Sequence, residues 1–383
     1  MDNLSVEELA LQRKRYAHLS DEQWRFMLQQ IDGRQRTQDK LPTFALMDDW
    51  WYPVRLSCEQ CSSEVAARYK AQLIAQYFPL EQSMTGVITD LTGGYGVDIY
   101  FMSEHANQAH YVERNEELCR IATHNFRHTR PQLKIHHTDA LSFLSQMSPS
   151  DVIYIDPARR DQHGGKVFRL EDCEPNVIDI LPLLSAKSKL LMIKLSPMLD
   201  ITQALHSLSG QWDVHIVAIK NEVKEVLLLS KTDNTTPMIH AVNITPSNTY
   251  SFTFTQEEEK HAQLPPYSPL ISPYVYIYEP NVAILKAGAY KLVAQRYGLT
   301  KMAQHTHLYF SEQLIENFPG RIWQIIDINP KQLRDIRANI LTRNYPITPD
   351  QLRKKSKIKD SDTHTLIGAR LGDKPTLFLC KKI

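Results

Sequence analysis

The sequence predicts a doubly wound α/β fold, preceded by a helical segment and followed by a small α+β module. Three observations support this prediction. Short apolar runs alternate with amphipathic stretches from Gly86 to Ser230, a glycine-rich turn follows the first of these runs, and residues 321–383 are strongly basic. Strands that alternate with helices typically form a parallel sheet with helices on both faces.

Length and composition limit the class of protein to which this prediction can apply. The chain has 383 residues, enough for two or three domains of roughly 100 to 200 residues. Its 42% apolar and 23% charged residues exclude wholesale disorder. No apolar run reaches the ~20 residues of a membrane span, and the amino terminus lacks the apolar core of a signal peptide. We therefore expect a cytoplasmic protein that does not enter a membrane.

Residues 1–80 show helical patterns and few strand signals. Apolar residues recur at helical spacing in 6–19, 21–31 and 64–78. We expect a helical amino-terminal segment over 1–80.

Residues 81–235 carry the alternating pattern. Strands are expected at 87–91, 109–113, 133–137, 151–156, 189–195, 212–219 and 225–230, with helical patterns between the first six. Only five residues separate the last two strands, which predicts an antiparallel strand at the sheet edge.

Beyond residue 231 the sequence turns polar and rich in proline, which predicts a domain junction near 232–270. Within it, 238–244 and 250–255 alternate like the strands of a hairpin. We then expect strands at 274–278, 307–311, 322–328, 364–370 and 376–380, and helices at 281–297, 331–341 and 350–357. These elements indicate an α+β region over 236–320 and a basic end domain over 321–383.

The basic charge is confined to that end domain. Residues 321–383 contain 14 Lys or Arg against 6 Asp, a net charge of +8, whereas the rest of the chain has 30 against 37, or −7. Three adjacent cations, Arg353, Lys354 and Lys355, form the densest part. Polyanions bind such patches by counterion release, although a solvated helix face is the commoner explanation of a charge run.

A glycine-rich turn follows the first strand of the central region, in the sequence DLTGGYGVD from Asp90 to Asp98. Glycines here allow a ligand to approach the backbone, and the next helix offers unpaired N–H groups. The spacing is neither that of the dinucleotide fingerprint nor that of the phosphate loop. A strand-end carboxylate suits a ligand with a cationic ammonium group, so Asp90, Thr92, Gly93, Gly94 and Gly96 are candidate binding residues.

Three more carboxylates end successive strands: Glu113, Asp139 and Asp156. Ligands of open α/β sheets sit outside the carboxyl ends of the strands, and an acid about 20 residues past the glycines typically accepts ribose hydroxyls. All four acids therefore point to one crevice. The alternative for each is a helix cap.

This set of residues resembles the class I S-adenosylmethionine (SAM) dependent methyltransferases, whose sheet is Rossmann-like. The resemblance covers roughly 86–230. It implies that the glycine loop with Asp90 and Thr92 holds the methionine part of SAM, Glu113 the ribose and Asp139 the adenine.

More narrowly, five stretches resemble a group of bacterial methyltransferases with a ferredoxin-like insert and a THUMP-like end domain. The stretches are QCSSE, DLTGGYGVD, DPARR, KLSPMLD and RNYPITPDQLRKK. The resemblance implies a ferredoxin-like region over 236–320 and a THUMP-like domain over 321–383. Since THUMP domains bind RNA, it also implies an RNA partner.

The fourth strand ends in DPARR, which departs from the [DN]-P-P-[YFW] pattern of enzymes that methylate amino groups. Asp156 and Pro157 are present, whereas Ala158 and Arg159 replace the second proline and the aromatic residue. Asp156, Pro157, Arg159 and Lys194 are the candidate catalytic residues, and Lys194 either faces the pocket or pairs with Asp156. We expect methylation of a base nitrogen in tRNA or rRNA.

Candidate substrate-binding residues are Arg159 and Arg160, in a basic loop with Lys166, together with Arg353, Lys354 and Lys355. Arginine forks match phosphate oxygens, but ion pairs with Asp161, Glu171 or Asp172 are an equal alternative. Cys173 is a weak candidate for the thiolate that carbon methylation needs.

Metal and redox sites are not expected. Cys58 and Cys61 form a CxxC with no second pair, and Ser57–Gln60 is typical of a capping box that opens a helix. Two other functions remain open: methylation of a protein or small molecule, and RNA binding without catalysis by a protein that retains SAM. The sequence leaves the oligomeric state and the modified nucleotide undetermined.

Overall fold

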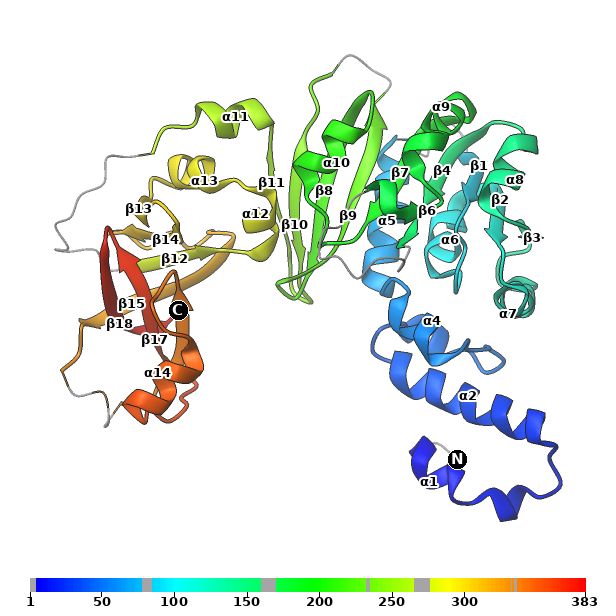
Figure 1. Cartoon of the computed structure of the whole chain (residues 1–383), viewed down its shortest axis with the longest axis horizontal. Helices are drawn as coiled ribbons and strands as arrows, with labels where there is room; N and C mark the ends of the chain where they lie inside the picture. Colours follow the sequence, from blue (N-terminus) through cyan, green and yellow to red (C-terminus); the bar gives the residue numbers. More distant parts are fainter. Residues whose placement is uncertain are drawn as a thin grey trace. The chain divides into compact units, whose positions relative to one another are not determined.

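The computed structural model describes residues 5–77, 85–159, 170–231, 235–264, 276–331, 333 and 336–383 (Figure 1). The chain divides into two compact units. The first consists of Met1–Asp213 with Lys224–Thr235, and the second of Val214–Val223 with Thr236–Ile383. Among the described residues, no helix combines the length and apolar character needed to cross a membrane.

A parallel sheet forms the centre of the first unit. Its strands are β1 (Thr85–Asp90), β2 (Ala106–Glu113), β3 (Leu133–His137), β4 (Ser150–Ile155), β7 (Ser188–Leu195) and β9 (Glu222–Lys231), in the order β9-β7-β4-β1-β2-β3. All neighbours pair in parallel except β9, which is antiparallel to β7. The antiparallel strand was predicted at the sheet edge, and this position is wrong: in the strand order β9 lies between β7 and β8 (Gln211–Ile219). The predicted doubly wound α/β fold is confirmed. The strand order reverses between β1 and β4, where such sheets bind ligands.

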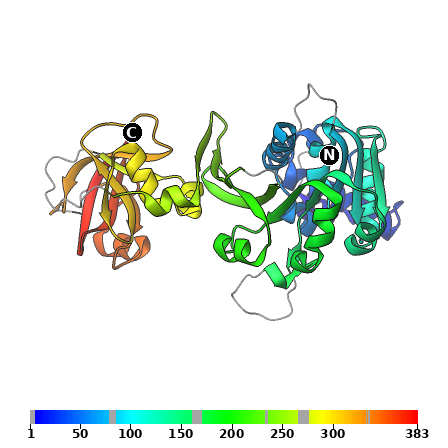
Figure 2. The same cartoon turned by 90° about the horizontal axis from the view of Figure 1, so that it is seen from above.

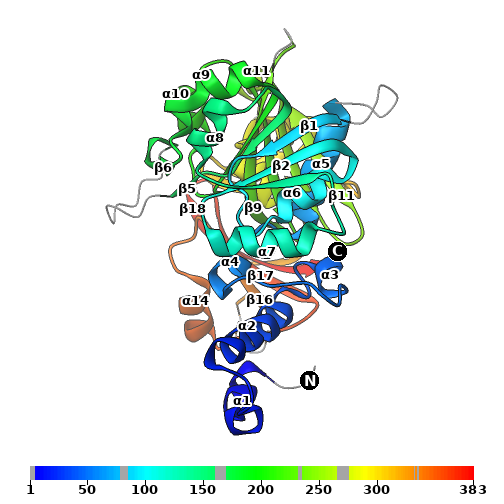
Figure 3. The ribbon, with the colours of Figure 1, turned by 90° about the vertical axis from the view of Figure 1, so that its right-hand side faces the viewer.

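Helices cover both faces of this sheet. On one face lie α5 (Glu64–Tyr77), α6 (Val97–Met102) and α7 (Glu116–Phe126), and on the other α8 (Ala140–Gln146), α9 (Val177–Lys187) and α10 (Ile201–Ser207) (Figure 3). The strands are apolar on both sides because both faces are covered, and Ile88, Ile153 and Ile193 are fully buried.

The amino-terminal helices pack against the same sheet domain. They are α1 (Val6–Ala10), η1 (Arg13–Tyr16), α2 (Asp21–Thr37), α3 (Pro42–Ala45) and α4 (Arg55–Gln60). The capping-box prediction at Ser57 is wrong: α4 begins after its N-cap Val54, so that Ser57 lies inside the helix, and it ends at Gln60. The Pro-containing turn before α4 sets this earlier start.

Contacts of Trp50 and Trp51 help to attach this segment to the sheet domain. The Asn125 side chain of α7 accepts a hydrogen bond from the Trp51 N–H (2.8 Å) and donates one to its carbonyl (2.9 Å). The Trp50 indole packs beside Phe126 and donates to the Tyr95 hydroxyl at 2.9 Å. The helical segment is thus part of the first unit rather than a separate body.

The second unit begins with three strands. β8 (Gln211–Ile219), which starts in the first unit, pairs in parallel with β10 (Ile239–Ile244), and β10 pairs antiparallel with β11 (Thr249–Phe254). The hairpin predicted for 238–255 is confirmed. It is followed by α11 (Gln256–His261).

A seven-stranded sheet forms the rest of the second unit, in the order β13-β14-β12-β15-β18-β17-β16. The strands are β12 (Tyr276–Pro280), β13 (Thr300–Ala303), β14 (Thr306–Ser311), β15 (Gly320–Ile328), β16 (Asn339–Arg343), β17 (His364–Leu371) and β18 (Lys374–Lys382). Beside them lie α12 (Val282–Ala287) and α13 (Tyr290–Tyr297) (Figure 2), and α14 (Pro349–Ser356) follows β16. Gly288, in the left-handed region at φ 77°, divides the predicted helix 281–297 into α12 and α13.

The predicted helix over 331–341 is wrong for the described residues of this range; 332, 334 and 335 lie outside the described residues. Residues 339–343 form β16, which pairs in parallel with β17. Ile340 packs in one apolar cluster and Leu341 in another. Because both faces of this strand pack against apolar side chains, its sequence lacks the alternation that identifies a strand.

A buried carboxylate ties three strands of this sheet together. Glu279 of β12 is 2% exposed and pairs with Arg321 of β15 and Arg343 of β16, the latter at 2.6 Å. The same carboxylate therefore links both halves of the seven-stranded sheet.

Candidate functional site

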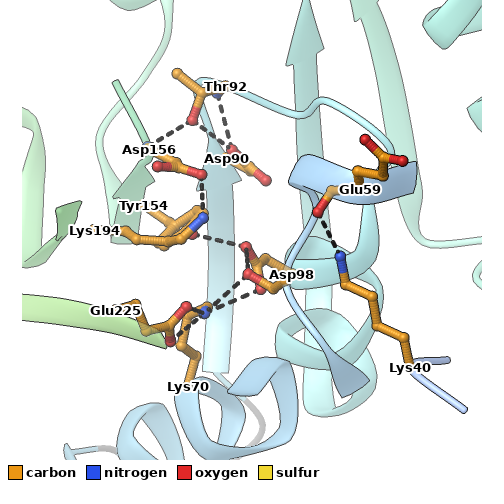
Figure 4. Close-up of polar contacts among 11 residues, drawn as sticks. Lys40, Glu59, Lys70, Asp90, Thr92, Asp98, Tyr154, Asp156, Lys194 and Glu225 are labelled. Carbon is orange, nitrogen blue, oxygen red and sulfur yellow. Dashed lines mark hydrogen bonds and ion pairs between the residues drawn. The ribbon is translucent and has the colours of Figure 1, made fainter. Parts of the chain in front are cut away.

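The glycine loop begins where β1 ends. The Asp90 carboxylate accepts hydrogen bonds from the Thr92 N–H (2.9 Å) and hydroxyl (3.3 Å), which turns the chain sharply, and Thr92 in turn accepts one from the Asp156 N–H (Figure 4). A Cβ on Gly93 would lie 2.3 Å from the Tyr111 ring, and one on Gly96, at φ +83°, 2.5 Å from the Phe126 ring. Only glycine fits at these two positions.

A cavity of about 610 Å³ opens beside this loop, within the size range of small-molecule sites. Its walls include all seven cofactor candidates and Asp156. The structure therefore brings the four strand-end acids together, as expected for the carboxyl edge of a parallel sheet. The cofactor candidates in the walls are Asp90, Thr92, Gly93, Gly94, Gly96, Glu113 and Asp139.

Two of these acids are held by backbone N–H groups. Glu113 accepts hydrogen bonds from Gly94 (2.9 Å) and Asn115 (2.8 Å), so it is fixed against the glycine loop. Asp139 is exposed and caps α8 by accepting from the Ser142 N–H at 2.9 Å. The capping alternative is thus realised at Asp139, which also lines the cavity.

Asp90 is 1% exposed, and its protonation is strongly perturbed. Burial raises the pKa of this carboxyl well above its usual value, and the negative charges of Asp98 and Asp156 add to the rise. Hydrogen bonds from Thr92 oppose it only in part. A cation bound beside Asp90 would favour its ionised form.

Asp156 is joined to Lys194. The Lys194 ammonium of β7 binds the Asp156 carboxylate directly (Figure 4). Burial lowers the pKa of Lys194, but the charges of Asp156, Asp98 and Glu225 outweigh it and raise that pKa above its usual value. Lys194 is therefore a permanent cation, and of the two arrangements that the sequence left open, the structure has the pair with Asp156.

Behind this pair lies a second ion pair that the sequence analysis missed. Lys70 of α5 is fully buried and binds both Glu225 oxygens at 2.5 and 2.6 Å, with Asp98 at 3.2 Å. Asp98 also accepts from the Tyr154 hydroxyl at 2.8 Å. The available signal was a lysine on the apolar face of a helix, flanked by Ala66, Ala67, Leu73 and Ile74.

The cavity is strongly acidic. Its walls carry seven carboxylates, against one arginine, Arg114, which pairs with Glu174 at 2.8 Å. Such a surface favours a cationic ligand and disfavours phosphate. The seven are Asp90, Asp98, Glu113, Asp139, Asp156, Glu174 and Asp179.

None of the basic candidates is among the described residues that line the cavity. The Arg159 backbone forms β5 (Ala158–Arg159), paired with β6 (Cys173–Glu174), but its side chain, Arg160 and Lys166 lie outside the described residues. Arg353, Lys354 and Lys355 are in the last turn of α14, in the second unit. There Arg353 pairs with Asp360 at 2.6 Å, and both lysines are exposed.

None of the five cysteines forms a disulfide bond. Burial raises the pKa of the Cys58 thiol to about 12, and Cys173 is buried. Within the described ranges no group of three or more His, Cys, Asp or Glu side chains could hold a metal ion.

The site suits SAM in three respects. The loop backbone at Gly93 and Gly96 leaves no space for side chains, so a ligand can lie against it. Glu113 can accept hydrogen bonds from a ribose diol. The acidic walls, with Asp90 poised to ionise, match a ligand that carries both an ammonium and a sulfonium charge.

Comparisons with known proteins agree with this chemistry. The crystal structure of a candidate methyltransferase from Porphyromonas gingivalis W83 is 36% identical, covers 95% of this chain and 92% of its own, and superimposes with a TM-score of 0.83. A SAM-dependent methyltransferase of Mycobacterium tuberculosis, itself uncharacterised, is 20% identical over 330 residues, which are 84% of this chain and 85% of the relative.

Two family models match within the second unit. A ferredoxin-like domain matches residues 276–319, and a THUMP-like domain matches residues 320–382. Together they span all seven strands of the larger sheet in that unit.

Proposed function

Because the chain belongs to the SAM-dependent methyltransferases, we propose that it methylates a base nitrogen in RNA. The proposal depends above all on one observation: the Asp156 carboxylate stands at the carboxyl end of β4, in the wall of the cofactor cavity, and is fixed there by Lys194.

The residues around the glycine loop would hold the cofactor. Asp90 and the loop backbone suit the methionine end, Glu113 the ribose, and Asp139 the neighbourhood of the adenine. Bound SAM supplies an electrophilic methyl group on a positively charged sulfur.

Asp156 would hold the acceptor. A carboxylate paired with a lysine can only accept hydrogen bonds, so it selects a donor such as the exocyclic amino group of a base. The Pro157 carbonyl offers a second acceptor in the adjacent position. Orientation of this kind contributes much of the rate in a two-substrate transfer.

The charge of the cavity favours nitrogen as the acceptor. A neutral amino nitrogen becomes positively charged as it takes a methyl cation, and its proton is lost afterwards. The excess of carboxylates in the walls stabilises that developing charge.

RNA is the proposed substrate because of the second unit. It contains the THUMP-like match and the exposed lysines of α14. Phosphates of the substrate would contact this basic surface and the Arg159–Arg160 loop rather than the acidic cavity.

The test is transfer of labelled methyl groups from SAM to total RNA from cells that lack this gene, followed by nucleoside analysis. We expect one labelled nucleoside. Asp156→Ala should lower kcat at least ~100-fold without weakening SAM binding, since positioning in the transition state is removed. Glu113→Ala is the matched variant, because it should weaken SAM binding instead.

Absence of label in RNA, with SAM still bound, would contradict the proposal. Transfer to a protein or a small amine would then identify the acceptor, since the acidic cavity also suits such a group. Wild-type rates for Asp156→Ala would remove its role.

A further inference from the structure

One wall of the cavity comes from the amino-terminal segment rather than from the sheet. The end of α4 and the two residues after it contribute Ser57, Gln60, Cys61 and Ser62. The Ser62 hydroxyl donates to Asp98 at 2.9 Å, at the start of α6. Two parts of the chain that are far apart in sequence thus enclose one cavity.

The end of α4 is rigidly supported. The Lys40 ammonium donates to the carbonyls of Cys58 (2.9 Å) and Glu59 (2.8 Å), which are among the last carbonyls of the helix (Figure 4). A cation at this position also complements the helix dipole. Cys58 is 1% exposed, so the helix is anchored on its inner side.

The wall formed by the end of α4 lines the same cavity as Asp156. In Figure 4, the α4 residue Glu59 and the residue Asp156 lie on opposite sides of Asp90. Burial raises the pKa of the Cys61 thiol, and the positive charges of Lys40 and Lys194 both act against that rise. Cys61 is therefore within electrostatic reach of the lysine that holds Asp156.

Of the residues on this wall, Gln60 is suited to form hydrogen bonds with a substrate base. Gln60 is exposed and lines the cavity, and among the described residues its side chain makes no hydrogen bond. A carboxamide both donates and accepts, whereas the carboxylate of Asp156 only accepts. The two groups thus offer complementary hydrogen-bonding patterns within one cavity.

We propose that Gln60 reads the edge of the acceptor base next to the amino group held by Asp156, and so determines which base is methylated. This role rests on the proposed function. A carboxamide can make paired hydrogen bonds to a base edge that combines a donor and an acceptor. The chemical class recognised is therefore a nucleobase with an exocyclic amino group beside a ring nitrogen acceptor.

The test measures kcat/KM for RNA and the dissociation constant of SAM for three variants. Gln60→Ala should lower kcat/KM about tenfold while SAM binding is unchanged, as expected when one or two hydrogen bonds to the substrate are removed. Gln60→Glu, which cannot donate, should alter the relative rates on synthetic RNAs that differ only at the target base. Glu59→Ala is the control, since Glu59 is on the same helix, pairs with Arg55 and is absent from the cavity wall.

The outcomes separate the two proposals. No methyl transfer to RNA by the wild-type protein would overturn the proposed function and this role with it. Transfer to RNA that Gln60→Ala leaves unchanged would overturn the role of Gln60 alone. Weaker SAM binding in Gln60→Ala would place this side chain against the cofactor and would also overturn the role.

Discussion

Asp90 is the most deeply buried of the four strand-end acids, and its burial makes SAM binding sensitive to pH. The raised pKa keeps the carboxyl protonated to a higher pH in the free protein than in an exposed Asp. A bound cation favours the ionised form, so that binding releases a proton. SAM affinity should therefore rise with pH until the raised pKa is passed and then level off.

Calorimetry in two buffers of different ionisation enthalpy would measure this proton release. Asp90→Asn should abolish it and weaken binding, since the variant removes the carboxylate that a bound cation would ionise. Equal proton release by the variant would show that another group titrates.

Lys194 permits a prediction about how the Asp156 carboxylate is positioned. Lys194→Met should lower kcat while SAM binding changes little, because the variant leaves Asp156 in place but removes the cation that fixes it. The expected decrease is ~10- to 100-fold, smaller than for Asp156→Ala. Single-turnover kinetics at saturating SAM would measure it, and an equal effect on SAM binding would argue for a purely structural role.

At the residue scale the sequence predicted the groups on the sheet edge and missed those behind it. Asp90, Glu113 and Asp156 each stand at the end of a predicted strand, and a glycine-rich turn follows Asp90. Lys70, Asp98 and Glu225 meet only because α5, α6 and β9 pack together. Long-range pairs of this kind leave no local pattern.

The glycine loop is the element on which the cavity depends, and two of its glycines allow a matched comparison. Both have positive φ, but a Cβ on Gly96 would collide with Phe126 at 2.5 Å, whereas one on Gly94 has nothing nearer than 3.8 Å. Gly94→Ala should therefore cost about 1 kcal/mol of stability from backbone strain, and Gly96→Ala clearly more. Urea unfolding of both variants would test this order.

The buried Lys70 of α5 permits a second prediction, which concerns the free energy of unfolding. Lys70→Met should lower the free energy of unfolding by about 3–5 kcal/mol, since Glu225 and Asp98 would be left buried without their cation. Lys189→Met is the control: its side chain is 74% exposed and pairs with Asp151, so the decrease should stay below about 1 kcal/mol. Similar decreases in both variants, measured by urea unfolding, would contradict this account.

Elements were predictable where a continuous or alternating apolar run, or a glycine at a turn, marks them. The strands of the first unit and the hairpin β10–β11 were predicted from their short apolar runs. The helix expected at 331–341 failed because β16 has only two adjacent apolar residues, Ile340 and Leu341, which pack in different clusters. Helix α4 begins earlier than expected because its start depends on the preceding turn rather than on a capping side chain.

For the whole molecule, the region proposed to bind SAM and the region proposed to bind RNA differ in charge. The cavity of the first unit is acidic, and the exposed lysines of α14 are in the second unit. RNA affinity should therefore depend on salt through α14 and not through the cavity.

Lys354→Ala with Lys355→Ala should weaken RNA binding and lower the slope of log K against log salt by about 1 for each phosphate that the variant no longer neutralises. SAM binding should not change. Lys260→Ala, an exposed lysine of the same unit that pairs with Glu257, is the control for removal of charge alone. An unaltered slope in the double variant would exclude α14 from the RNA interface.

Glu279 lies on β12, close to the point where the chain crosses from one family match to the other in space. The ferredoxin-like match ends at residue 319 and the THUMP-like match begins at 320, yet β12 and β15 are hydrogen-bonded across that boundary, with Pro280 opposite Gly320. A Cβ on Gly320 would lie 2.0 Å from the Glu279 carbonyl. The two family matches therefore cover parts of one hydrogen-bonded sheet, so cleavage of the chain at their boundary should leave the two parts held together through β12 and β15.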